Sequence, residues 1–342
     1  FMVPNSTAVL QSALSSKEKP FLTIAIPTYN RAALLEQCLQ RLATQVQATD
    51  TLIEVIISNN ASTDNTKVVA SIYQSCFSRF RYVENETNIG ADGNIAQAFR
   101  LAEGQYVWVF SDDDVLLPGY FNDIIALLQQ EQPGLMHLSS VWHAGTIVPL
   151  YEQKPFKAAI YRDGLDYIRQ VHHWATFITA NIINKSLVAN SPLTYAFPAT
   201  NLVQLGWTLP VVFKASCNIV VSTPVIAAKS ESSGDYKAFQ TFATNFNSIL
   251  SRLVQSEEIP GEVQHIVNVE MLGSELPRLL YATDFGRKDK YADEPVFRTL
   301  LINYWRYPAF WRNIVVAYLK LPVRPAWNLF KNLLKTSPDA SK

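Results

Sequence analysis

Three consecutive carboxylates are the residues of this 342-residue chain best suited to chemistry. Asp112, Asp113 and Asp114 come directly after the apolar run Tyr106–Phe110, which predicts a buried strand. Because unpaired charges are costly to bury, the acids should lie exposed in a cleft and be compensated there. Mg²⁺ or Mn²⁺ would do so, since these ions take oxygen ligands from carboxylates together with substrate phosphates. Alternatively, the acids precede a helix near Leu117–Phe121 and favour the positive end of its dipole.

Apolar strands and helices alternate ahead of this acidic triplet. The expected strands are Phe21–Pro27, Ile53–Ser58, Phe80–Glu84 and Tyr106–Phe110, and the expected helices are Ala32–Thr44, Thr66–Phe77 and Ile95–Ala102. Such alternation predicts an α/β fold with a mixed, mainly parallel sheet and helices on both faces. Ligands of such sheets bind beyond the carboxyl ends of the strands, where every polar cluster of this half lies.

The second half of the chain is less regular. We expect helices at Tyr120–Glu131, Gly164–Val171 and Asn201–Phe213, and strands at Leu135–Val141, Gly145–Tyr151, Thr176–Ile183 and Ile219–Ala228. From Tyr236 onward the apolar spacing is helical. The expected organisation is therefore a poorly ordered segment 1–19, an α/β domain at 20–235 and a helical C-terminal extension at 236–342.

Composition narrows the class of protein. A hydrophobic content of 48% supports a full core, and a formal charge of zero provides no global field that would attract nucleic acid. Cys38, Cys76 and Cys217 are widely spaced and indicate a reducing compartment. No apolar run approaches the roughly 18–20 residues that cross a bilayer, and no secretion signal is apparent. We expect a cytoplasmic protein, free or peripheral at the inner membrane.

Polar clusters also follow the other strands of the first half, at Pro27–Arg31, Asn59–Thr66 and Asn85–Asn94. In the first of them Pro27 is expected to end the strand, and Tyr29 offers a ring for stacking. Taken singly, each cluster is typical of a loop with a helix cap. Their order and spacing are more informative than any one of them.

In this order the clusters resemble the sequence pattern of the family 2 glycosyltransferases, which have the GT-A (Rossmann-like) fold. The resemblance covers residues 21–119 and is carried by Ile26–Arg31, Ser58–Thr66, Asn88–Asn94 and Tyr106–Asp114. The Trp-x-x-x-Asp-Asp-Asp form of the last motif is most similar to bacterial O-antigen enzymes, including abequosyltransferase-like ones. Beyond about residue 130 the resemblance is faint.

The resemblance implies a nucleotide-sugar donor and a divalent metal ion, Mg²⁺ or Mn²⁺. Asp114, together with Asp112, would ligate the metal that bridges the donor diphosphate. Asp112 would face the ribose side, and Asp113 would also contact the donor. The metal would neutralise the charge that grows on the leaving nucleoside diphosphate. The other residues expected around the donor are Pro27, Thr28, Tyr29, Arg31, Asn59, Asn60, Asn88, Asp92 and Asn94.

One departure from the family pattern concerns the donor base. Many relatives carry an Asp at the position of Asn59, where its carboxylate accepts the N3–H of uracil. Cytosine has an acceptor at N3 and a donor at N4, so an amide matches it better and favours a CDP-sugar, such as a CDP-3,6-dideoxyhexose. Asn60 or backbone groups are alternative readers of the base, and a UDP- or dTDP-sugar is the alternative donor.

A second departure concerns the catalytic base. Inverting relatives carry an acid where this chain reads Pro198–Leu205, and no Asp or Glu occurs from Tyr167 to Ser230. His173 or its neighbour His172 is one candidate base. Glu231 and Asp235, in a loop that we expect to fold over the site as a lid, are another candidate. In a retaining reaction the leaving phosphate itself would take the acceptor proton, and the sequence leaves the three alternatives open.

Basic and aromatic residues interleave without an acid between Pro295 and Pro338, where the basic residues are Arg298, Arg306, Arg312, Lys320, Arg324, Lys331 and Lys335. This pattern is typical of a helix on an anionic membrane surface, and it favours a polyprenyl-diphosphate-linked glycan acceptor over nucleic acid. The alternative is a helix packed on the domain, with a soluble acceptor. A nucleotidyltransferase would need a glycine-rich loop after the first strand, and a non-catalytic sugar-binding protein would not need three clustered acids.

Overall fold

The computed structural model describes residues 18–143, 151–188, 191–230, 237–286 and 295–320. The chain divides into two units, Phe1–Gly234 with Ile249–Val263, and Asp235–Ser248 with Gln264–Lys342. Outside the described residues lie residues 1–17 of the expected disordered segment, almost all of the expected strand Gly145–Tyr151, and Glu231. The part of the basic and aromatic tail beyond Lys320 lies outside them as well.

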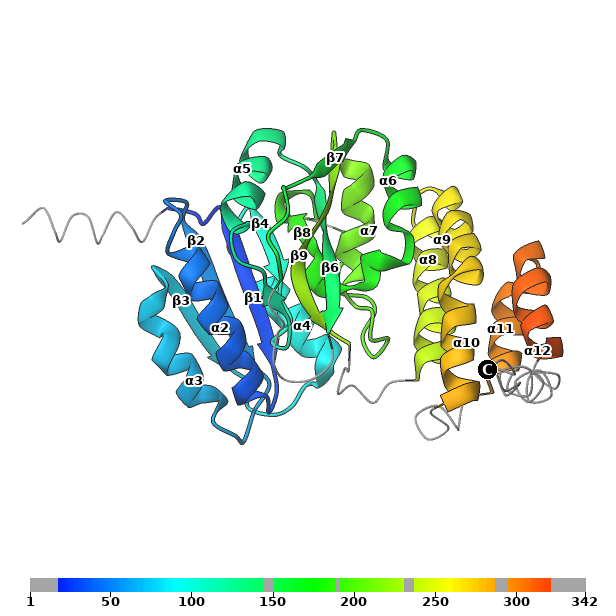
Figure 1. Ribbon diagram of the computed structural model, residues 1–342, viewed down its shortest axis with the longest axis horizontal. Helices are drawn as coiled ribbons and strands as arrows, with labels where there is room; N and C mark the ends of the chain where they lie inside the picture. The colour runs from blue at the N-terminus through cyan, green and yellow to red at the C-terminus, as the bar shows by residue number, and fades with distance from the viewer. Residues whose placement is uncertain (1–17, 144–150, 189–190, 231–236, 287–294, 321–342) are drawn as a thin grey trace, which may run out of the picture. The chain divides into compact units, whose positions relative to one another are not determined.

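The described residues of the first unit form one mixed sheet of nine strands (Figure 1). The strand order is β3-β2-β1-β4-β8-β6-β9-β5, and β7 also pairs with β9. The strands are β1 (Leu22–Thr28), β2 (Ile53–Asn59), β3 (Arg79–Glu84), β4 (Tyr106–Val109), β5 (Val115–Leu116), β6 (Leu135–His143), β7 (Ala158–Tyr161), β8 (Asn181–Asn184) and β9 (Asn218–Lys229). The predicted α/β class is confirmed.

Helices cover both faces of this sheet, as expected. On one face, Leu35, Leu39 and Leu42 of α2 (Ala32–Val46) join a core cluster with β1 and β2. On the other, Phe99 of α4 (Gly90–Leu101) stacks on Trp207 of α7 (Leu205–Lys214), with ring centroids 4.3 Å apart. Burying a side chain of this size contributes about 1.5–3 kcal/mol. Further α-helices among residues 18–230 are α3 (Thr66–Tyr73), α5 (Phe121–Glu131) and α6 (Gly164–Val171).

Parallel pairing dominates only the first half of the sheet. β1 pairs in parallel with β2 and β4, and β2 with β3. In the second half, β8 runs antiparallel to β4 and β6, while β9 runs parallel to β6 and antiparallel to β5. Because β5 begins at Val115, directly after the acidic triplet, its pairing with β9 brings the end of β9 to the acids.

The predicted strand Thr176–Ile183 is wrong over its first half. Residues 172–176 and 178–180 form short 3-10 turns, and the strand begins only at Asn181. The Asn181 amide donates to the carbonyls of Ala175 and Phe177, at 3.1 and 2.8 Å, and so holds the preceding chain in its turns. Local side-chain bonds of this kind compete with a strand ladder.

Two helices begin at other positions than expected. α4 starts at Gly90 rather than Ile95, because Gly90 has φ +79° and donates its N–H to the side chain of Asn88 at 2.8 Å. α7 starts at Leu205 rather than Asn201, whose positive φ of 60° interrupts a helix. The strand β7 was not predicted.

The second unit is helical where it is described. The α-helices after residue 236 are α8 (Phe246–Gln255), α9 (Gly261–Gly273), α10 (Glu275–Gly286), α11 (Val296–Tyr304) and α12 (Val316–Lys320), and Gln240–Asn245 and Phe310–Val315 are π-helical. Residues Ile249–Val263, which include most of α8 and the start of α9, are counted with the first unit. Buried amides join these helices: Asn247 donates to the Tyr304 hydroxyl at 2.9 Å and accepts from Asn268 at 2.7 Å. Among the residues that the structure describes, no helix is both long and apolar enough to span a bilayer.

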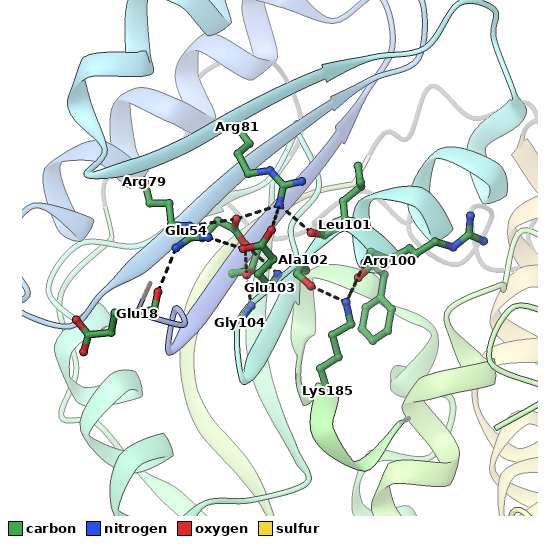
Figure 2. Close-up of polar contacts among 12 residues, drawn as sticks. Glu18, Glu54, Arg79, Arg81, Arg100, Leu101, Ala102, Glu103, Gly104 and Lys185 are labelled. Atoms are coloured by element: carbon green, nitrogen blue, oxygen red, sulfur yellow. Dashed lines mark hydrogen bonds and ion pairs between the residues drawn. The ribbon is translucent and has the colours of Figure 1, made fainter. Parts of the chain in front are cut away.

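A charged network closes the amino-terminal ends of β2 and β3 (Figure 2). Glu54 is wholly buried and accepts from the Thr23 hydroxyl at 2.6 Å and from Arg81 at 3.2 Å. Arg79 and Arg81 both pair with Glu103 as well. Lys185 donates to three carbonyls at the end of α4 and in the turn after it, those of Phe99, Arg100 and Ala102. The charged side chains at this end of the sheet thus find their hydrogen-bond and ion-pair partners within the protein.

Candidate active site

The acidic triplet lies at the carboxyl end of β4, as expected, but two of its three members are buried. Asp112 is 2% exposed and Asp114 is 3% exposed. The expectation that these acids would be exposed in a cleft is therefore wrong. Burial is tolerated because a guanidinium and a backbone amide from distant parts of the chain compensate them.

Arg31 compensates Asp112. Its guanidinium donates to Asp112 Oδ1 at 2.9 Å and to Asp113 Oδ2 at 3.3 Å. Burial raises the pKa of Asp112 to about 6, against the attraction of Arg31, and Asp113 raises it further. Although burial opposes its charge, the neighbouring carboxylates raise the pKa of Arg31. The result is a cation beside two acids at the end of a strand.

Asp114 is compensated by the end of β9. Its Oδ1 accepts the backbone N–H of Lys229 at 3.1 Å. Burial raises the pKa of Asp114 to about 7, and the charge of Asp113 acts in the same direction. A carboxyl group in this state gains a proton near neutral pH unless a cation joins it.

The two buried acids fit a divalent cation. The Oδ2 atoms of Asp112 and Asp114 are buried and have no hydrogen-bond partner in the described structure. Within the same residues, no group of three or more His, Cys, Asp or Glu side chains could hold a metal ion by itself. An ion here would therefore take further oxygen ligands from a bound phosphate or from water, which is how Mg²⁺ is usually held.

The loop after β1 presents its polar residues beside this triplet. β1 continues through Pro27 to Thr28, so Pro27 does not end the strand. Tyr29 is 43% exposed, which leaves its ring available for stacking. The side-chain oxygen of Asn30 accepts the N–H of Thr63 at 2.8 Å and so fixes this loop to the loop after β2. Arg31 is thereby held at the start of α2.

Asn59 differs from its expected role. It is wholly buried, its amide nitrogen donates to the Tyr82 hydroxyl at 2.7 Å, and its oxygen accepts the N–H of Ser62 at 3.1 Å. Each end of the amide keeps one further bonding position, but the side chain is wholly buried, so a base could reach it only if the neighbouring side chains moved. In this structure Asn59 joins β2, β3 and the loop between β2 and α3.

Three of the other expected donor residues also bond to the protein. Asn60 donates to Asn88 at 2.8 Å and accepts the backbone N–H of Ile89 at 2.9 Å. Asn94 accepts from the Ser58 hydroxyl at 2.7 Å and donates to the Ser58 carbonyl at 2.9 Å. These amides fasten α4 and its leading loop to the end of β2. Among the remaining expected donor residues, Thr28 is buried with its hydroxyl unbonded in the described structure, whereas Tyr29 and Arg31 are partly exposed.

Asp92 holds the loop in which inverting relatives carry their base. Its Oδ2 accepts the backbone N–H groups of Thr200 and Asn201, at 2.7 and 2.8 Å. Burial raises the pKa of Asp92, and these two N–H groups oppose that rise. Asp92 therefore holds the backbone of this loop with Oδ2, while its Oδ1 is buried without a hydrogen bond in the described structure.

Of the candidate bases, the structure describes the histidines but not the acids. His173 is buried, with its Nδ1 2.9 Å from Nδ1 of His172 and its ring 4.9 Å from Trp174. Glu231 and Asp235 lie outside the described residues. His143, a buried residue at the end of β6, was not predicted as a candidate, and its ring nitrogens have no hydrogen bond in the described structure. The role of Lys229 in compensating Asp114 was not predicted either, because this contact uses only the backbone N–H and does not depend on the residue type.

Residues 23–185 match the sequence profile of the family described as Glycosyl transferase family 2. The chain is similar to abequosyltransferase RfbV of Salmonella typhimurium, 36% identical over 109 residues that cover 32% of this chain and 31% of that protein. It is also similar to GalNAc(5)-diNAcBac-PP-undecaprenol beta-1,3-glucosyltransferase of Campylobacter jejuni, 32% identical over 120 residues, or 35% of this chain and 37% of that protein. The chain thus spans about a third of the length of these curated relatives.

Solved structures extend the likeness over more of the chain. S. aureus TarS 1–349 in complex with UDP-GlcNAc superimposes with a TM-score of 0.61 at 18% identity, covering 83% of this chain and 82% of that one. The same protein in complex with UDP gives a TM-score of 0.57. A likeness at this identity shows the fold alone, and it is the expected GT-A fold.

Proposed function

Because residues 23–185 match the family 2 glycosyl transferase profile, we propose that this chain moves a sugar from a nucleotide-sugar donor to a glycan acceptor at the acidic triplet. The observation that carries the proposal is the buried pair Asp112 and Asp114, whose Oδ2 atoms have no protein partner beside the guanidinium of Arg31. Buried carboxylate oxygens at a strand end are ligands of the kind that a hard divalent cation takes. A site that receives a cation and a diphosphate requires them.

The donor would lie along the end of β1. Tyr29 offers its exposed ring to the base, and Arg31 offers a positive charge to the diphosphate. Asp112 and Asp114 would hold Mg²⁺ or Mn²⁺. Such an ion, when bound, supplies a positive charge that stabilises the leaving nucleoside diphosphate.

The transfer breaks the bond between the anomeric carbon and the diphosphate oxygen and forms a bond to an acceptor hydroxyl. Arg31 keeps its charge through the reaction, since neighbouring carboxylates raise its pKa. It can therefore stabilise the negative charge that moves onto the diphosphate. The acceptor proton goes to His173 or Glu231, or to the leaving phosphate in a retaining reaction.

We propose a CDP-sugar donor as the first to test, although its support has changed. The preference rested on the amide of Asn59 as the group that reads the base, and that amide is buried and bonded to Tyr82 and Ser62. The similarity to an abequosyltransferase still supports a CDP-sugar donor, since abequose is a dideoxy sugar of the class expected from the sequence. UDP- and dTDP-sugars are the alternatives.

We propose a lipid-linked acceptor at the membrane surface. One of the relatives is named for an undecaprenol-linked substrate. In the second unit, Trp305 and Trp311 are both exposed, and so are Arg298, Arg306 and Arg312. Exposed aromatic and basic side chains on one segment suit an anionic headgroup layer.

Melting of the wild type and of Asp114→Asn with CDP, UDP, GDP or dTDP, each with and without Mn²⁺, tests the proposal. Ligand binding raises the melting temperature by mass action. The wild type should be stabilised by one nucleotide only when Mn²⁺ is present, and Asp114→Asn should lose that dependence and most transfer activity. Asp123→Asn, an exposed acid in the first turn of α5, is the matched control. Transfer by Asp114→Asn at the wild-type rate would overturn the assignment, and release of pyrophosphate would indicate a nucleotidyltransferase.

A further inference from the structure

Two exposed tryptophans lie near the candidate active site without a part in the chemistry described above. Trp142, near the end of β6, is 48% exposed, and Trp174, in the turn after α6, is 39% exposed. Their ring centroids are 6.1 Å apart, and the ring of Phe177 lies 5.1 Å from that of Trp142. We call Trp142, Trp174 and Phe177 the aromatic platform. Exposed apolar groups gathered in this way mark binding surfaces.

One side of the platform is tied to Asp114 through β9. In the pairing of β6 with β9, Trp142 lies opposite Ala228. The next residue, Lys229, donates its backbone N–H to Asp114 Oδ1 at 3.1 Å. The platform thus begins one residue from the strand position that holds Asp114.

The other side is tied to the same strand end through Thr179. This residue follows Phe177 by two positions, and its hydroxyl accepts the backbone N–H of Ser111 at 3.1 Å. Its carbonyl accepts the indole N–H of Trp108 in β4 at 2.6 Å. Both sides of the platform are therefore fixed to the segment that carries the triplet.

The sheet order separates the platform from the donor residues. Tyr29 and Arg31 follow β1, which lies on one side of β4. The platform is attached to β6 and to the turns before β8, on the other side of β4. A nucleotide held at Tyr29 leaves the platform side of the triplet for the second substrate.

We propose that the aromatic platform is an acceptor subsite that binds the apolar face of a pyranose ring in the acceptor glycan. One face of a pyranose presents C–H groups, which pack on the electron-rich faces of indole and phenyl rings. The hydroxyl groups at the rim of the sugar need polar neighbours, and the partly exposed His172, in the same turn as Trp174, is one. The proposal rests on the proposed function and adds the recognition element for its acceptor.

Steady-state kinetics with the glycan acceptor tests the subsite. Trp142→Ala combined with Trp174→Ala should raise the acceptor KM about tenfold or more, because two stacking faces are lost. The dissociation constant of this double variant for the nucleoside diphosphate should stay at the wild-type value. Trp142→Phe should recover most of the affinity, since it keeps an aromatic face. The control Ile72→Ala shortens an exposed apolar side chain on α3 and should not change the acceptor KM. An unchanged acceptor KM in the double variant would overturn the proposal.

A second measurement separates the platform from the proposed function, because it needs no donor. The intrinsic tryptophan emission of the wild type should shift when methyl glucopyranoside, galactopyranoside or mannopyranoside is added. Sorbitol has similar hydroxyl groups but no ring face, and should give no shift. The double variant should lose the response. A wild type without a response, or a double variant that responds equally, overturns the platform. If no nucleotide sugar is turned over, the proposed function fails while this titration still decides the platform.

Discussion

Asp92 accepts the backbone N–H of Asn201 at 2.8 Å, although 109 positions separate the two residues in the sequence. The same carboxylate oxygen accepts the N–H of Thr200, so one side chain of α4 holds two consecutive amides of a distant loop. Asn94 fixes the same helix to the end of β2. The loop and the end of β2 therefore share one support.

Asp92→Ala should destabilise the protein by about 2 kcal/mol, because two amides lose a charged acceptor. Asp92→Asn keeps an acceptor oxygen and should cost less. The free energy of unfolding in urea measures both changes, and Asp123→Asn, an exposed acid on α5, is the control. An Asp92→Ala protein as stable as the wild type would contradict a supporting role for this contact.

Without metal, Asp114 should make the protein less stable as pH rises. Its folded pKa of about 7 lies above the model-peptide value of 3.8, so the folded state binds more protons between these values. The free energy of unfolding should therefore fall from pH 4 to pH 7, by an amount on the order of 2–4 kcal/mol. Asp114→Asn should have a flatter profile and be the more stable protein at pH 8.

Mn²⁺ or Mg²⁺ supplies the control for that profile. The ion binds the charged form of the acid, so it should raise the stability of the wild type at pH 8 and have little effect on Asp114→Asn. Parallel pH profiles for the two proteins, with or without the ion, would show that Asp114 does not titrate as described.

His137 should make the protein sensitive to acid. Burial lowers its pKa from 6.5 to about 4, although the bond to Asn181 opposes the shift. The unfolded state then binds more protons in this range, so stability is present above pH 6.5 and is lost as the pH falls toward 4. The loss amounts to about 3 kcal/mol. His137→Gln should flatten this part of the profile, whereas His265→Gln, at an exposed position, should keep the wild-type slope.

The catalytic base can be identified from two variants. His173→Asn should lower kcat by about 100-fold, with donor binding unchanged and the acidic limb of the pH profile removed. Glu231→Gln is the companion, since it removes the other candidate. NMR of the product gives the anomeric configuration. Near wild-type turnover by both variants, with retained configuration, would assign the acceptor proton to the leaving phosphate.

The exposed basic residues of the second unit should bind anionic vesicles. Changing Arg298, Arg306 and Arg312 together to Gln should weaken vesicle binding at least tenfold at low salt, since each charge contributes about 1 kcal/mol. The difference should shrink as salt rises. The control changes three exposed cations of the first unit, Arg41, Lys157 and Arg162, to Gln. Equal vesicle binding by the two triple variants would show that Arg298, Arg306 and Arg312 do not form a specific membrane-binding surface.

The strands and helices of the first half were predictable because their apolar spacing is local. The burial of Asp112 and Asp114 was not, since their compensation comes from Arg31, 81 positions away, and from Lys229, 115 positions away. Asn59 shows the same limit. Its residue type suggested an amide free to read a base, but Tyr82 on the neighbouring strand takes that amide. The sequence thus indicates where a site lies better than it indicates which of its polar groups face a ligand.

The charged network around Glu54 also affects how molecules of this protein meet. β3 is the terminal strand of the sheet order, and such a strand offers unpaired backbone groups to any other strand that approaches. Arg79 and Arg81 of β3 are held by Glu54 and Glu103. A strand from a second molecule would have to pack against these fixed, hydrated charges. The contacts that fasten β3 to β2 therefore also guard the sheet against edge-to-edge aggregation.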